Sequence, residues 1–195
     1  MLPDFVPEAL QERARIHRLR KGHRLFRSGE AVESIYFVVT GEVKAVRYLP
    51  DGSESVMLRA GAGQFFAETG LAIERYVCDA ICCSGTAMLV ALPVADVRKR
   101  LEQDPAFSMA FLLYLAKAVR KQCSVSERLR LKKARERVLH YLICESGPEQ
   151  TIELQIPLSD WSHELGLEPE TLYRVLRELE QDNIIDRNKR RIRLL

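Results

Sequence analysis

The sequence LSDWSHELGLEPETLYRVLRELEQDN, residues 158–183, predicts two short helices separated by a glycine turn. Ser159 is a candidate N-cap for the first helix, and Trp161 and Leu165 give that helix an apolar side. Pro169 opens the second helix, because proline at the first helical position removes no hydrogen bond that the helix needs. One face of the second helix is apolar at i, i+3, i+4 and i+7, and its residues are Leu172, Val175, Leu176 and Leu179.

The opposite face of the second helix carries charged and aromatic side chains in its first two turns. A helix-turn-helix protein presents this part of its second helix to base edges in the major groove of DNA. The alternative is an ordinary amphipathic helix pair with a solvated charged face. The residues predicted to contact double-stranded DNA here are Pro169, Glu170, Thr171, Tyr173, Arg174 and Arg177.

The segment LGLEPETLYR, residues 165–174, resembles the helix-turn-helix of the Crp/Fnr family of bacterial transcription regulators, in which a glycine turn precedes Glu-Thr-x-x-Arg. The resemblance extends over nearly the whole chain. Glu168 departs from the family's usual capping Ser or Thr, and Tyr173 from its usual Ser or Gly. The resemblance implies a homodimer on a palindromic site with TGA-type half-sites, in which Arg174 donates to guanine and Glu170 accepts from a base amino group. It also implies RNA polymerase as a partner, as for an activator.

The length and composition of the chain limit its domain number, its location and the roles of its cysteines. The chain has 195 residues, of which 47% are hydrophobic, and this is ample for one large or two small buried cores. The sequence contains no apolar run long enough for a signal peptide or a membrane span, so we expect a cytoplasmic protein with no membrane contact. Five cysteines without an export signal argue against a disulfide framework, and leave free thiols, metal ligands or buried core as their roles.

Net charge does not by itself predict DNA binding. Residues 132–195 contain 11 basic and 12 acidic residues, so this half of the chain is not basic overall. Basic residues do gather in the tail around Arg190, where they can meet DNA phosphates. The helix-turn-helix motif therefore carries the prediction.

The first half of the chain predicts a β-rich domain. Residues 10–20 are expected as a short helix or arm, and β-type runs at 35–40, 43–48 and 55–58 follow between glycines. Asp51-Gly52 predicts a hairpin. Short strands with glycine corners favour a sandwich or barrel, and their order resembles the β-roll of cyclic-nucleotide-binding domains.

The ligand pocket of this domain departs from that of nucleotide-binding relatives, in which a Gly-Glu pair and an Arg-Ser pair hold the ribose and the phosphate. Ala67-Glu68 replaces the first pair, and alignment of the next strand places Cys78-Asp79 at the second. A thiol and a carboxylate cannot neutralise a cyclic phosphate, and an ionised Asp79 would repel it. We therefore expect no cyclic nucleotide; the alternative is a nucleotide-responsive regulator in which Arg75 substitutes from a different position.

A long helix is predicted past Asp104-Pro105, to about residue 131. Apolar residues recur there in alternating steps of four and three, which is the pattern of a dimerisation seam. The alternative is that this helix packs only on its own β-roll. The predicted dimer interface is Phe111, Leu115, Ala118, Gln122, Val125 and Leu129.

The predicted fold is α+β: a jelly-roll-like N-terminal β-roll sensor domain at 1–104, a dimerisation helix at 105–131 and a winged helix-turn-helix at 132–195. Lys132-Lys133 interrupts the apolar periodicity and marks a hinge, and 134–144 resumes it as a helix. A strand at 152–156 and a hairpin at 184–195 complete the winged domain.

Cysteines are candidates for signal sensing. Alignment of the long helix places Gln122 and Cys123 beside the ligand of nucleotide-binding relatives, which predicts an effector pocket of Glu68, Cys78, Asp79, Gln122 and Cys123. Thiolates there could bind a soft metal such as Cu(I) or Zn(II), or be oxidised, and the candidate ligands are Cys78, Cys82, Cys83 and Cys123. The alternative is an effector-independent regulator whose cysteines only pack. No cysteine precedes Cys78, so the N-terminal iron-sulfur device of the family's oxygen sensors is not expected.

Enzymatic function is not expected. His163-Glu164 has no second histidine four residues on, and the sequence has neither a Walker phosphate loop nor a nucleophile elbow. A nucleotide-binding module that acts on a protein partner is a further alternative, against which the helix-turn-helix counts.

Overall fold

The computed structural model describes residues 2–147, 149–154 and 156–195. These residues form two compact units, which divide between Leu113 and Tyr114. Within the described residues, no helix combines the length and the apolar character that a membrane span requires.

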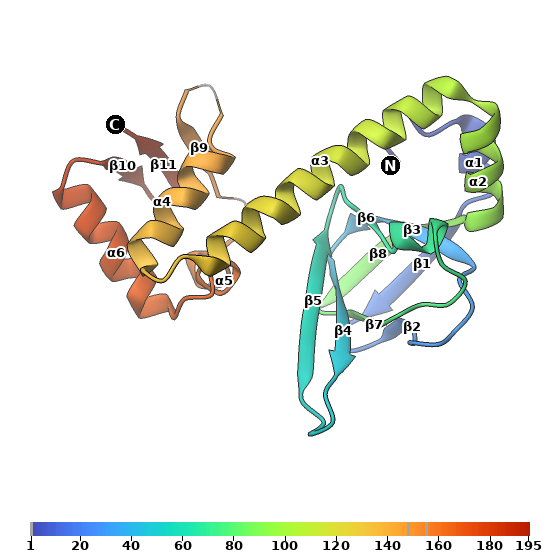
Figure 1. Ribbon diagram of the computed structural model, residues 1–195, viewed down its shortest axis with the longest axis horizontal. Coiled ribbons are helices and arrows are strands. Elements are labelled where there is room, and N and C mark those ends of the chain that lie inside the picture. The colour runs from blue at the N-terminus through green and yellow to red at the C-terminus, as the bar shows by residue number, and fades with distance from the viewer. Residues whose placement is uncertain (1, 148, 155) are drawn as a thin grey trace. The chain divides into compact units, whose positions relative to one another are not determined.

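The first unit is a roll of two antiparallel four-stranded sheets (Figure 1). One sheet has the strand order β1-β8-β3-β6, and the other has the order β2-β7-β4-β5. The elements in chain order are α1 (Glu8–Gln11), β1 (Arg15–Arg20), β2 (Arg24–Phe26), β3 (Ser34–Thr40), β4 (Glu42–Tyr48), β5 (Glu54–Gly61), β6 (Phe65–Phe66), the 3-10 helix η1 (Glu68–Leu71), β7 (Asp79–Cys82), β8 (Thr86–Pro93) and α2 (Val94–Gln103).

The core of the first unit lies between the two sheets, because alternate side chains of facing strands point inward. Val38 of β3, Val43 of β4 and Leu89 of β8 are completely buried in one cluster. Phe26 stacks on Tyr76 with 3.6 Å between ring centroids. The β-roll predicted from the sequence is therefore confirmed.

The predicted strands of the roll agree closely with the observed ones, with one exception. Asp51-Gly52 forms the turn of the long β4–β5 hairpin seen in Figure 1, and Gly52 has a φ of 82°, which favours glycine. The predicted helix or arm at 10–20 is wrong for most of its length. Helix α1 ends at Gln11, and Arg15–Arg20 is a strand because it pairs with β8 along its whole length.

Helix α3 (Pro105–Arg130) begins in the first unit and ends in the second. The carboxylate of Asp104 caps it by accepting a hydrogen bond from the backbone N–H of Phe107, at 3.0 Å. Phe111 is 2% exposed and makes an edge-to-face contact with Phe65 at 5.5 Å between ring centroids. Its own unit therefore buries Phe111, and the place of this side chain in the dimer seam stays a prediction.

The second unit is a winged helix-turn-helix, as predicted. Its core surrounds Trp161 and Leu142, which are buried with the apolar faces of its helices. The strand predicted at 152–156 ends at Glu153, and Gln155 lies outside the described residues. After α3, the elements are α4 (Ala134–Glu145), β9 (Thr151–Glu153), α5 (Leu158–Glu164), α6 (Pro169–Gln181), β10 (Ile185–Asn188) and β11 (Arg191–Leu194), with strands in the order β10-β11-β9.

A buried arginine holds the corner between α3 and α4. The guanidinium carbon of Arg128 lies 4.5 Å from the centre of the Tyr141 ring, and one of its nitrogens lies 3.5 Å from the Glu145 carboxylate. The residue is only 2% exposed. A buried charge of this kind needs such partners to offset its lost hydration, so these contacts fix the end of α3 against α4. The helix break that follows coincides with the predicted hinge at Lys132-Lys133.

Candidate DNA-binding site

Helix α6 separates an apolar face from a polar face completely. Leu172, Leu176 and Leu179 are fully buried, and Val175 is 2% exposed. Pro169 occupies the start of the helix, as predicted. Glu168 is the N-cap residue, but its side chain makes no capping hydrogen bond. The apolar face of α6 is buried against the core of the unit, and this burial fixes the direction in which the polar face points.

The turn before α6 is held by an arginine that no sequence motif marks. Gly166 has a φ of 63°, in the left-handed region that favours glycine. Arg137 of α4 donates hydrogen bonds to the carbonyl of Gly166 at 2.9 Å and to the carbonyl of Leu131 at 2.7 Å. One guanidinium therefore joins the turn of the motif to the residue that follows α3. A β-carbon on Gly166 would lie 3.2 Å from this guanidinium, so the site has little room for a side chain.

The start of the first helix of the motif differs from the sequence prediction. Helix α5 begins at Leu158, and its N-cap residue is Pro157, which makes no side-chain capping bond. Ser159 lies inside the first turn, where its hydroxyl is 3.4 Å from the Asp160 carboxylate. The prediction that Ser159 caps the helix is wrong, because the N-cap position lies two residues earlier, at Pro157.

The polar face of α6 is open to solvent. Glu170, Tyr173, Arg174 and Arg177 are all exposed, while Pro169 and Thr171 are half-buried. The guanidinium of Arg174 lies 3.3 Å from the carboxylate of Glu178, one turn further along the helix. A base contact by Arg174 therefore requires that Arg174 leave an intramolecular partner.

The hairpin β10–β11 forms a basic wing. Its turn contains Lys189 and Arg190, both exposed, and Lys189 has a left-handed φ of 54°. Arg187 is committed to the fold, because two of its nitrogens lie 3.0 and 3.2 Å from the Glu180 carboxylate of α6. Only part of the basic tail is therefore available to phosphates, and Arg190 lies in that part.

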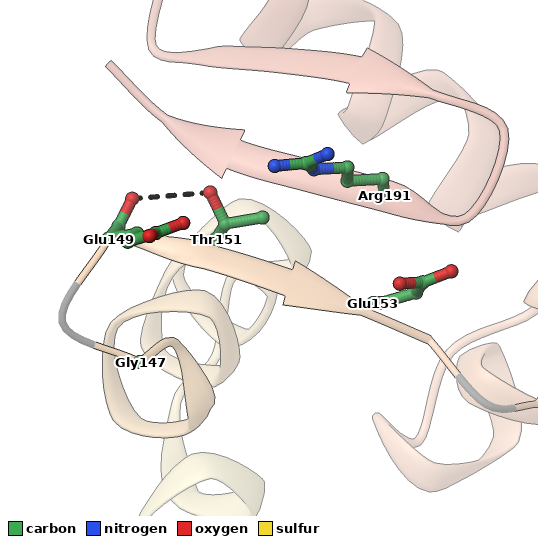
Figure 2. Close-up of a pocket in the computed structure, with 5 residues that line it drawn as sticks. All are labelled: Gly147, Glu149, Thr151, Glu153 and Arg191. Atoms are coloured by element: carbon green, nitrogen blue, oxygen red, sulfur yellow. Dashed lines mark hydrogen bonds between the residues drawn. The ribbon is translucent and has the colours of Figure 1, made fainter.

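A shallow hollow beside the wing is acidic (Figure 2). Figure 2 shows Thr151 and Glu153 on β9 and Glu149 two residues before its start, with Arg191 on the neighbouring strand β11. Gly147 completes the lining. Two carboxylates facing one guanidinium do not favour a phosphate, so this hollow is a poor candidate for DNA contact.

The residues of the predicted effector pocket in the first unit are engaged with the protein itself. Asp79 accepts a hydrogen bond from the backbone N–H of Ser28 at 2.8 Å, and its other oxygen lies 3.0 Å from Nε of Arg24. Burial raises the pKa of the Glu68 carboxyl above its usual range. Arg75, the possible substitute for a phosphate-binding arginine, donates to the carbonyl of Gly29 at 2.8 Å.

Gln122 and Cys123 are exposed on the part of α3 that belongs to the second unit. Their grouping with Glu68, Cys78 and Asp79 in one pocket stays a prediction.

The structure does not assemble the predicted metal ligands. Cys82 is 1% exposed in the core of the roll, and Cys83 donates from Sγ to a Glu42 oxygen at 2.8 Å. Burial and the bond to Glu42 raise the pKa of Cys83 to about 12, and burial also raises the pKa of Cys78. In the part of the chain that the structure describes, no three Cys, His, Asp or Glu side chains are grouped as ligands of a metal ion. The soft-metal site at Cys78, Cys82, Cys83 and Cys123 stays a prediction that no such group supports.

Helix α3 leaves a different apolar stripe exposed from the one predicted. Leu115, Ala118 and Val125 of the predicted seam are half-buried, while Gln122 and Leu129 are exposed. The largest exposures belong to a neighbouring stripe, in which Leu112 is 57% and Val119 is 62% exposed. The exposed stripe follows i, i+4, i+7 and i+11, and consists of Leu112, Ala116, Val119 and Cys123.

Comparisons with known proteins agree with this architecture. A family model described as a cyclic nucleotide-binding domain matches residues 16–104, and one described as a Crp-like helix-turn-helix domain matches residues 136–195.

Relatives match over most of the chain. The chain is 27% identical over 187 residues to the CRP-like protein Clp of Xanthomonas campestris, covering 88% of this chain and 81% of Clp. It is 23% identical to the cAMP-activated global transcriptional regulator CRP of Haemophilus influenzae, covering 87% of this chain and 79% of that protein. The solved structure of FixK2 from Bradyrhizobium japonicum superposes with a TM-score of 0.64 at 24% identity, covering 93% of this chain and 92% of that one.

Proposed function

Because this chain belongs to the Crp/Fnr family of DNA-binding transcription regulators, we propose that it acts as a homodimer that reads a palindromic DNA site through α6. The observation that carries the proposal is the division of α6 into a buried apolar face and an exposed face with Glu170, Arg174 and Arg177. In this proposal, residues 1–104 sense a signal, residues 105–131 dimerise and residues 132–195 bind DNA.

Base readout is assigned to the first two turns of α6. Arg174 donates two hydrogen bonds to guanine O6 and N7, and Glu170 accepts from the amino group of cytosine or adenine, as TGA-type half-sites require. Formation of the guanine contact breaks the pair of Arg174 with Glu178. An exposed pair at this spacing is worth only about 0.3–0.5 kcal/mol, whereas a bidentate base contact discriminates by about 1–3 kcal/mol. The exchange therefore favours the base.

Phosphate contacts are assigned to the exposed part of the wing. Arg190 stands in the turn of the β10–β11 hairpin and is not needed for its fold. Contacts of this kind position the protein on the duplex and carry no base information. Arg187 is excluded from this role by its two-nitrogen pair with Glu180.

Dimerisation is assigned to the exposed stripe of α3. Leu112 and Val119 on this stripe are more than half exposed in the single chain, and their spacing fits a coiled-coil seam. A two-fold dimer covers an apolar stripe of this kind and places two reading helices on one palindrome.

The signal is proposed to be something other than a cyclic nucleotide. Asp79, at the position of a phosphate-binding residue in nucleotide-binding relatives, is held by Arg24 and by the backbone of Ser28. Release of Arg24 to a phosphate would leave this carboxylate beside the anion, which is unfavourable.

The test is selection of binding sites from a random pool of DNA duplexes, followed by affinity measurement on the selected site. The wild-type chain should select an inverted repeat, and Arg174→Ala should lose preference at one base pair of each half-site. Arg190→Ala is the matched control, since it removes a positive charge from the exposed turn of the wing, to which no base contact is assigned. Selection of no sequence, or unchanged base preference in Arg174→Ala, would show that α6 does not read DNA in this way.

A further inference from the structure

Three side chains with complementary chemistry meet at the junction of α3 and α4. Sγ of Cys144 lies 3.7 Å from Nδ1 and 3.8 Å from Nε2 of His140, one turn earlier on α4. Nε2 of the same ring lies 3.1 Å from a carboxylate oxygen of Glu127 on α3. In an activated nucleophile of this type, the thiol is the nucleophile, the imidazole is its base, and the carboxylate orients the imidazole.

The geometry assigns a role to each ring nitrogen. Glu127 accepts a hydrogen bond from Nε2–H, and this fixes the neutral tautomer in which Nδ1 has no proton. The sulfur lies almost equally far from both ring nitrogens, so it is the contact of Glu127 with Nε2 that leaves Nδ1 to accept the proton of the Cys144 thiol. The His140 side chain is 15% exposed, so the packing of α4 restricts the ring. Glu127 is the positioning residue, and at 70% exposure it remains accessible to water.

None of the other cysteines combines an exposed thiol with a neighbouring histidine in the described residues. Cys82 is buried in the roll, and burial raises the pKa of both Cys78 and Cys83. Cys123 is exposed like Cys144, but among the described residues it has no histidine or hydrogen-bond partner. Cys123 is therefore an internal reference for a thiol of similar exposure without a neighbouring base.

We propose that Cys144 is a peroxide-reactive modification site, activated by His140 and positioned by Glu127. The thiol proton passes to Nδ1 of His140, and the thiolate attacks one oxygen of hydrogen peroxide. The sulfur–oxygen bond forms as the oxygen–oxygen bond breaks, so that sulfur loses two electrons and peroxide gains them. The proton on His140 then goes to the leaving hydroxide, and the products are a sulfenic acid and water. This chemistry requires neither DNA nor a dimer, so it goes beyond the proposed function.

The first test is competitive alkylation of the reduced, full-length chain with a limiting amount of iodoacetamide near pH 7, with each cysteine quantified by peptide mass spectrometry. Every sample carries Leu112→Glu, so that the proposed dimer does not cover Cys123. An ordinary thiol is only a few per cent ionised at this pH, so activation should make Cys144 react roughly tenfold or more faster than Cys123. His140→Asn should reduce the rate of Cys144 to that of Cys123, and Glu127→Gln should reduce it partly. The rate of Cys123 should stay constant in all three proteins, which shows that they remain folded alike.

The second test exposes the same proteins to hydrogen peroxide and traps sulfenic acid with dimedone. Adducts should appear first at Cys144, and His140→Asn should abolish that preference. Equal alkylation rates at Cys144 and Cys123, or an unchanged Cys144 rate in His140→Asn, would overturn the proposal. DNA affinity measured on the unoxidised proteins without Leu112→Glu is a separate readout, so failure of the DNA-binding proposal and failure of this one are distinguishable.

Discussion

Arg137 is the residue on which the geometry of the DNA-binding motif depends most directly. Its guanidinium donates to the carbonyls of Leu131 and Gly166 at 2.7 and 2.9 Å, and a third contact, to the carbonyl of Leu165, is long at 3.4 Å. A hydrogen bond that involves a charged group contributes about 1.5–3 kcal/mol. Both bonds are only partly shielded from water, so we expect Arg137→Ala to lower the free energy of unfolding of the second unit by about 2–3 kcal/mol.

The chain offers a local probe for this measurement. Trp161 is the only tryptophan, and it is fully buried in the core of the second unit. Its fluorescence during urea unfolding therefore reports the unit that contains Arg137, independently of the roll. The DNA affinity of Arg137→Ala should fall as well, because the turn before α6 loses its anchor to the residue after α3.

A matched control lies on the same helix. Arg135 makes one ion pair, with Asp182 at 2.7 Å, and both side chains are at least a third exposed. Surface pairs contribute about 0.2–1 kcal/mol, so Arg135→Ala should have a small effect. Arg137→Lys keeps the charge but cannot donate to both carbonyls from one planar group, and it should fall between the two. If Arg137→Ala costs no more stability than Arg135→Ala, the guanidinium does not hold the turn.

Four other outcomes are expected. Arg174→Ala should cost about 1–3 kcal/mol on the selected site and relax one base pair, whereas Arg190→Ala should weaken all sequences alike and reduce the slope of log affinity against log salt by about one. Leu112→Glu should convert the dimer into a monomer in sedimentation and abolish tight DNA binding, and a dimer that survives this change would rule out the exposed stripe of α3. Stability should fall between pH 9 and pH 12 because the folded state holds the Cys83 proton up to a pKa of about 12 and the unfolded chain releases it at about 9. Burial also raises the pKa of Cys78, Tyr36 and Tyr141, so Cys83→Ser should reduce this loss without removing it, and an equal loss in Cys83→Ser would place its origin elsewhere. Calorimetry with cyclic AMP or cyclic GMP should show no saturable heat, and a micromolar isotherm would contradict the proposed role of Asp79.

The helices of the second unit were predictable because local patterns specify them. Burial of Leu172, Leu176 and Leu179 follows from their spacing, and the start of α6 follows from Pro169. The strands predicted at 35–40, 43–48 and 55–58 were equally accessible, since glycine corners separate them. Strand β1 was missed, because its pairing with β8 is a long-range contact that no local pattern specifies.

Features that depend on distant partners were not predictable. The heptad pattern of α3 could not show that its own unit buries Phe111. Nothing in the sequence shows that the carboxylate of Asp79 forms an ion pair with Arg24 of another strand. Cys144 carries no signal of its own, because its significance depends on where Glu127 of α3 meets His140 of α4.

The pair between Arg174 and Glu178 has a consequence for the search along a chromosome. If Arg174 reads a guanine as proposed, its guanidinium must leave Glu178 at every guanine, in the correct half-site and elsewhere. A pair worth about 0.3–0.5 kcal/mol shortens the residence time at either kind of guanine by a factor of roughly two. Discrimination between sites must therefore come from the other contacts of α6.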